Sequence, residues 1–108
     1  MNLLTLYKRQ LSELAYFLAS VGEDRWSNRL ADWAHEFDST VSNSSTVKEH
    51  VARTKKALGG MGSIADIVIT HRNGLGKSFP ETELPIQNMR LASLISELYQ
   101  TACAMTEF

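Results

Sequence analysis

Apolar residues recur at steps of three and four along most of this chain, and this spacing constrains its fold more than any other feature of the sequence. Such spacing is typical of amphipathic α-helices, which bury one stripe against the rest of the protein. It predicts a first helix from about Asn2 to Val21, which Gly22 ends, and a second from about Asp24 to Asp38. The first stripe consists of Leu3, Tyr7, Leu11, Leu14, Leu18 and Val21, and the second of Trp26, Leu30, Trp33 and Phe37.

A third helix is predicted after a polar loop over residues 39–45. Thr46 and Glu49 have the spacing of a capping box, so the helix is expected to begin there and to run to Leu58. Its apolar stripe is thin, which favours a position on the surface of the bundle.

The last helix is predicted from about Ile86 to Met105, after the two prolines of the chain. The first and last helices carry the most apolar faces and are expected to supply the centre of the core. Four such helices predict a mainly α fold, in which residues 1–108 form a single-domain bundle of about four helices.

Three glycines stand within four residues between the third helix and the apolar run that follows it. Glycine takes positive φ at little cost, so this stretch predicts a tight reversal of the chain. Met61 is expected to fill the core, and Ser63 with Asp66 resembles a capping pair that favours at least one helical turn. The predicted structural turn comprises Gly59, Gly60, Met61, Gly62, Ser63 and Asp66. It lacks the ending of a phosphate-binding loop, and a structural role is favoured over anion binding.

Residues 67–79 leave two interpretations open. The run Ile67 to Thr70 is rich in β-branched residues, and Asn73-Gly74 is a strong hairpin signal. Residues 68–72 could therefore pair with residues 75–79 in a short β-hairpin. The competing interpretation is an irregular connection punctuated by glycine.

The composition excludes several classes of protein. The formal net charge of −1 on 108 residues provides no bulk attraction to nucleic acid or to membranes. Cys103 is the only cysteine, so neither an intramolecular disulfide nor a cysteine-rich metal site can form. The N-terminus lacks the order of a signal peptide, and no apolar run is long enough to span a bilayer. A cytoplasmic protein without cofactor or metal is expected.

No set of residues has the spacing of a catalytic or metal-binding constellation. His35, His50 and His71 are expected to be solvent-exposed, and Cys103 is expected to have a packing role. The second helix is acidic on the side opposite its tryptophans, and its residues Asp24, Asp32, Glu36 and Asp38 are the predicted partner-binding carboxylates.

The Trp-bearing helix and the Leu58-Gly59-Gly60-Met61-Gly62-Ser63-Ile64-Ala65-Asp66 stretch together resemble a family of small uncharacterised bacterial proteins. Members of this type resemble immunity proteins encoded beside polymorphic toxins, including those of contact-dependent growth inhibition. The resemblance implies a scaffold without catalytic residues that binds one toxin domain, often a nuclease, and occludes it stoichiometrically. The alternative is a regulatory or nucleic-acid-associated module that uses the basic segment 53–77.

Overall fold

In the computed structural model, which describes residues 2–41, 43–59 and 63–106, four α-helices account for most of the chain. They are α1 (Leu3–Ser20), α2 (Asp24–Thr40), α3 (Ser44–Gly59) and α4 (Leu84–Thr106). The prediction of a mainly α fold with four helices is confirmed. Three short 3₁₀ turns lie between α3 and α4: η1 (Ile64–Asp66), η2 (His71–Asn73) and η3 (Glu81–Glu83).

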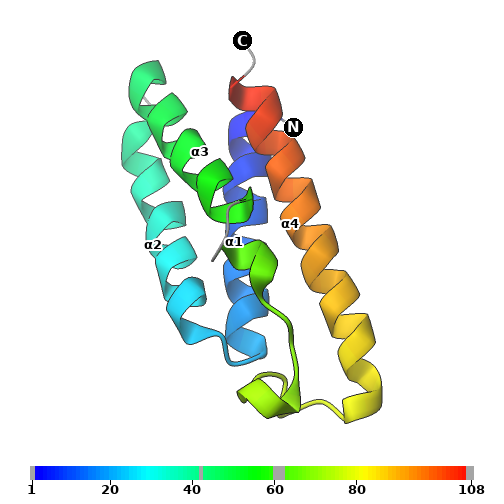
Figure 1. The fold of residues 1–108 in the computed structure, drawn as a ribbon. Helices are drawn as coiled ribbons and strands as arrows, with labels where there is room; N and C mark the ends of the chain where they lie inside the picture. The colour runs from blue at the N-terminus through cyan, green and yellow to red at the C-terminus, as the bar shows by residue number, and fades with distance from the viewer. Residues whose placement is uncertain (1, 42, 60–62, 107–108) are drawn as a thin grey trace.

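The helices lie side by side, and the 3₁₀ turns η2 and η3 gather at one end of the bundle (Figure 1). The main contacts join α1 to α2 and to α4, and α3 to α4 and to α2. Each helix therefore has two principal neighbours, and the apolar stripes meet between them. The side chains that are fully buried include Tyr7, Leu11, Leu14, Leu18, Leu30, Phe37, Val51, Ile64, Ile69 and Leu98.

Polar side chains set the helix boundaries. The Asn2 side chain accepts the Thr5 N–H at 2.8 Å at the start of α1, and Gly22, with φ of +89°, follows its end. The Asn43 side chain accepts the N–H groups of Ser45 and Thr46 at the start of α3.

Two predictions for the junction between α2 and α3 are wrong. Helix α2 continues to Thr40 and α3 begins at Ser44, so the predicted polar loop over 39–45 is mostly helical. The capping box at Thr46 and Glu49 does not start the helix, because Asn43 already supplies the cap and Thr46 lies inside the first turn. Several residue types compete for an N-cap, and spacing does not decide among them.

Of the two interpretations left open for residues 67–79, the β-hairpin is wrong, since this connection contains no strand among its residues, and the irregular connection is confirmed. Asn73 and Thr70 form a capping box around η2, and Gly74, with φ of +83°, ends that turn. The backbone of Ile69 is hydrogen-bonded to a side chain instead of a strand: Asn88 of α4 accepts its N–H at 2.8 Å and donates to its carbonyl at 3.1 Å. Side-chain groups of α4 thus satisfy the Ile69 backbone, whereas Asn73 within the connection bonds the Val68 carbonyl and the Thr70 N–H.

The glycine-rich turn is described only in part. Gly59 is the last residue of α3, and Ser63 caps η1 by accepting the Ala65 N–H at 3.2 Å. The expected helical turn after this stretch is therefore confirmed, and Asp66 is its last residue. Gly60, Met61 and Gly62 lie outside the described residues, so the expectation that Met61 fills the core stays a prediction.

No helix in the described ranges combines the length and the apolar character needed to cross a membrane.

Candidate partner-binding surface

The four predicted carboxylates all lie on α2 and are all exposed. They do not form one continuous face. The Asp38 carboxylate receives both hydrogen bonds of the Lys8 ammonium group at 2.6 Å, on the side of α2 that faces α1. The Glu36 carboxylate pairs with the Arg53 guanidinium at 3.1 Å, on the side that faces α3. Two of the four predicted residues therefore flank the helix on opposite sides.

Asp24 and Asp32 are the other two predicted carboxylates. Neither forms an ion pair with any residue of the described ranges. Asp32 lies one helical turn before Glu36, so these two carboxylates share one side of α2 as predicted. Asp24 lies in the first turn, where its charge complements the helix dipole.

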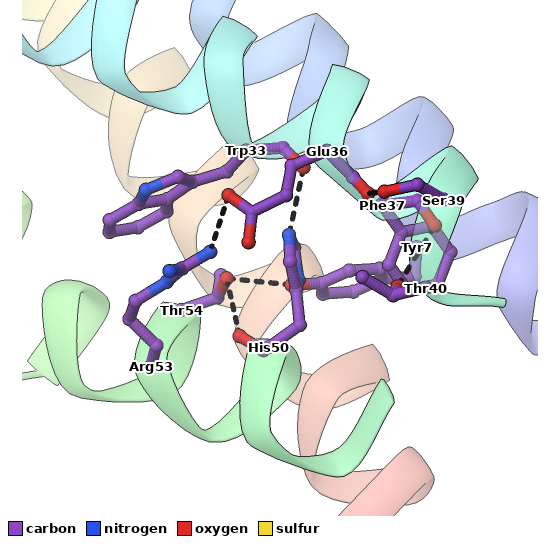
Figure 2. Close-up of polar contacts among 9 residues, drawn as sticks. All are labelled: Tyr7, Trp33, Glu36, Phe37, Ser39, Thr40, His50, Arg53 and Thr54. Atoms are coloured by element: carbon purple, nitrogen blue, oxygen red, sulfur yellow. Dashed lines mark hydrogen bonds and ion pairs between the residues drawn. The ribbon is translucent and has the colours of Figure 1, made fainter. Parts of the chain in front are cut away.

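Glu36 belongs to an ordered cluster with an aromatic side chain. The Arg53 guanidinium lies 4.8 Å from the centre of the Trp33 ring and also holds the Glu36 carboxylate (Figure 2). Trp33 is half-buried, so one part of its ring packs on the core and another part is available at the surface. We call Trp33, Glu36 and Arg53 the α2–α3 surface cluster. Tryptophan and arginine in such settings are enriched among residues that dominate binding energy.

A buried hydrogen-bond network lies directly beneath this cluster. His50 Nε2 is 2.8 Å from the Trp33 carbonyl oxygen, so that nitrogen carries the proton and donates it. His50 Nδ1 therefore carries no proton, and it lies 3.0 Å from the oxygen of the Tyr7 hydroxyl (Figure 2). The same hydroxyl donates to Thr54 Oγ1 at 2.6 Å, and the Thr54 hydroxyl reaches the His50 carbonyl oxygen at 3.2 Å. The network joins α1, α2 and α3 through polar groups inside the core.

Burial changes the proton affinity of both titratable groups in this network. Burial raises the pKa of the Tyr7 hydroxyl well above its usual value, against the hydrogen bond to Thr54. Burial lowers the pKa of the His50 imidazole, although the hydrogen bond to the Trp33 carbonyl acts in the other direction. Both side chains are thus held in their neutral forms at neutral pH.

The expectation that the carboxylates of α2 lie opposite its tryptophans is wrong for Glu36, because Arg53 contacts both Glu36 and the Trp33 ring. The expectation that all three histidines are solvent-exposed is wrong for His50, which is 3% exposed. The signal was present in the sequence, because His50 and Thr54 continue the thin stripe of the third helix at helical spacing. That stripe consists of Val47, His50, Val51, Thr54 and Leu58.

The other titratable candidates lie apart from this network. His35 is exposed on α2, and His71 is exposed in η2, where its Nε2 lies 2.9 Å from the Phe79 carbonyl oxygen. Cys103 is half-buried in α4. Within the described residues, no group of three or more His, Cys, Asp and Glu side chains could hold a metal ion.

The basic residues of segment 53–77 lie in different surroundings. Arg53 faces α2 through Glu36, whereas Lys55 faces α4, with its ammonium group 3.3 Å from Thr106 Oγ1 and 5.9 Å from the centre of the Tyr99 ring. Arg72 belongs to η2 and lines a groove with Glu81. Arg53, Lys55 and Arg72 therefore face different neighbours.

Comparison with known proteins gives one match. Neither a curated protein nor a solved structure matches this chain. Residues 19–76 match the family model described as Domain of unknown function (DUF6966). The matched range is more than half of the 108 residues and holds α2, α3, η1 and η2, including the α2–α3 surface cluster. The chain therefore belongs to the family described as domain of unknown function DUF6966.

Proposed function

We propose that this protein is an immunity-type protein that binds a cognate bacterial toxin domain, a nuclease, in the cytoplasm and neutralises it by stoichiometric occlusion. It acts by binding and performs no catalysis. In this proposal the carboxylates of α2 meet the basic nucleic-acid-binding cleft of the toxin, as in contact-dependent growth inhibition.

The observation that carries the proposal is the composition and order of the α2 surface. Asp32, which has no ion pair within the described residues, lies one turn from the α2–α3 surface cluster, where Arg53 holds the Glu36 carboxylate above Trp33. A half-buried tryptophan beside fixed carboxylates combines an apolar anchor with charges that steer a basic partner. The His50 hydrogen bond to the Trp33 carbonyl holds the underlying backbone in place.

Because the side chains of the α2–α3 surface cluster are already ordered, binding a partner costs less side-chain conformational entropy. Arg53 and Glu36 are long side chains that lose rotamer freedom at an interface, and here each is already held by the other. The pair itself is half-exposed and contributes little to the stability of the fold.

The proposal is tested with the toxin domain encoded by the neighbouring open reading frame. Co-expression is expected to restore growth, and calorimetry is expected to show a one-to-one complex. The double variant Asp32→Lys with Glu36→Lys should weaken binding by at least tenfold, about 1.4 kcal/mol, because both charges would then repel a basic cleft.

The matched control is Lys56→Glu with Lys77→Glu, which also reverses two exposed charges. Lys55 is unsuitable for this purpose because it contacts Thr106 of α4. The control should bind like wild type, and all variants should retain their helical circular dichroism. A folded Asp32/Glu36 variant with wild-type affinity would contradict the proposal. If the control variant fails instead and the wild type binds RNA or DNA in a salt-dependent way, the nucleic-acid-associated module using segment 53–77 is the function.

A further inference from the structure

The exposed side of α4 differs from every other helix surface in this protein, because it is almost uncharged. Among its 23 residues only Arg90 and Glu97 are charged, whereas the 17 residues of α2 include six charged ones. Large apolar side chains are exposed on the same helix: Ile86 is 61% and Met89 is 71% exposed. Charge depletion together with exposed Ile and Met is typical of the core of a protein interface.

The two charges of α4 are opposite in sign and lie on the same side of the helix. Arg90 and Glu97 are seven residues apart, so they lie on one stripe of the helix, about 10 Å from each other along its axis. Both are exposed, and neither forms an ion pair within the described part of the chain. The midpoint between them falls at Ser93 and Leu94, in the middle of the neutral stretch.

We propose that this stripe binds a second copy of the same chain, with the two α4 helices antiparallel and related by a two-fold axis near Ser93. An isologous interface requires a surface that is complementary to itself. Opposite charges placed equally far from the axis meet this requirement, because Arg90 then lies opposite Glu97 of the partner subunit and Glu97 opposite Arg90 of the partner subunit.

The side chains around the proposed axis allow close contact between the helices. Ala92, Ser93 and Ser96 are exposed and small, so the two helix backbones can approach at the crossing point. Ile86 and Met89 lie toward the Arg90 end of the stripe. The two-fold axis repeats every contact, so the interface would bury both side chains in each of the two copies.

A groove beside the stripe extends the proposed interface onto α1. It has a volume of about 600 Å³ and is lined from α4 by Arg90 and Leu94. From α1 it is lined by Tyr16, which is 79% exposed, and by residues that include the ion pair of Arg9 and Glu13. In Figure 1, α4 forms one edge of the bundle, with its outer side turned away from the other helices. This surface goes beyond the proposed toxin-binding function and lies on a different helix.

The proposal is tested by charge reversal and rescue. Sedimentation equilibrium over a concentration series is expected to show a dimer for the wild type. Arg90→Glu places like charges opposite each other at both symmetric contacts and should weaken dimerisation by at least tenfold, and Glu97→Arg should do the same. The double variant Arg90→Glu with Glu97→Arg restores opposite pairs and should return the dimer constant close to wild type.

Disulfide trapping locates the axis independently. In a Cys103→Ser background, Ser93→Cys should form a disulfide-linked dimer under mild oxidation, because the two Ser93 positions meet at the axis. Ser39→Cys, also exposed but on α2, should form no disulfide-linked dimer in the same assay. A wild type that stays monomeric at all concentrations, a failure of the double variant to recover, or equal trapping at positions 39 and 93 would each overturn the proposal.

Discussion

At the scale of single residues, the most unusual feature is a set of neutral polar groups inside an otherwise apolar core. Tyr7 is fully buried, and its hydroxyl lies within hydrogen-bond distance of both His50 and Thr54. A buried polar group is costly when it lacks a partner, so this network contributes to stability as a unit.

Removing the Tyr7 hydroxyl tests that contribution. Tyr7→Phe removes the hydroxyl that donates to Thr54 and contacts Nδ1 of His50, while the apolar packing of the ring stays intact. It should lower the free energy of unfolding by about 1–2 kcal/mol. Urea denaturation measures the change. Tyr16→Phe is the matched control, because Tyr16 is 79% exposed and the same substitution should change stability by less than about 0.5 kcal/mol. Equal effects of the two variants would show that the network is energetically neutral.

His50 should also make stability depend on pH. Burial lowers the pKa of His50 in the folded state below the usual value near 6.5, so the unfolded state binds a proton more readily. The contribution of neutral His50 to the free energy of unfolding is therefore fully present above the pKa that His50 has in the unfolded state. It is lost as pH falls through 6.5 toward the lower pKa of the folded state. Denaturation at pH 7.5 and at pH 5 should show a smaller loss of stability for His50→Gln than for wild type. His35 and His71 are present in both proteins, so the difference between the two proteins reports on His50.

At the scale of elements, the connection between α3 and α4 is shaped by specific contacts to its neighbours. Gly76 is buried with φ of +64°, and its N–H donates to the Val21 carbonyl at 2.8 Å, which ties the connection to the end of α1. A Cβ atom at this position would lie 2.7 Å from Cγ2 of Ile69 and 2.9 Å from Cδ2 of Leu84. Both the backbone conformation and the available space therefore require glycine.

Substituting alanine at two glycine positions should change the free energy of unfolding in opposite directions. Gly76→Ala should lower the free energy of unfolding by about 1–3 kcal/mol through strain and overlap. Gly59→Ala should raise it by about 0.5 kcal/mol, because Gly59 is helical and its Cβ would meet Tyr99 at an ordinary 3.9 Å. Thermal and urea unfolding measure both. A Gly76→Ala variant as stable as wild type would contradict this account of the connection.

At the scale of the whole molecule, the two proposed surfaces belong to different helices. The carboxylates of α2 and the α2–α3 surface cluster form the proposed toxin-binding surface, and the neutral stripe of α4 forms the proposed contact between copies. The main contacts of α2 are to α1 and α3 and not to α4. The Asp32/Glu36 variant should therefore still dimerise and the Arg90 variant should still bind toxin, so each experiment serves as a control for the other.

The sequence by itself determined the helices and the stripes that they bury. Spacing of three and four residues is a local property, and Leu11, Leu14 and Leu18 are buried where that spacing predicted. The same reasoning placed Asp32 and Glu36 on one side of their helix, since residues four apart always share a side. Helix ends were less predictable, because Asn43 and Thr46 are both acceptable caps by residue type.

Tertiary structure decided which polar groups are buried and where the connection between α3 and α4 finds its hydrogen bonds. His50 is buried because Tyr7 and the Trp33 carbonyl, 43 and 17 residues away in the chain, meet it inside the bundle. Residues 67–70 stay extended without a partner strand because Asn88 of α4 binds the Ile69 backbone. These outcomes depend on contacts between distant segments, whose free energy outweighs local preferences such as the Asn73-Gly74 hairpin signal.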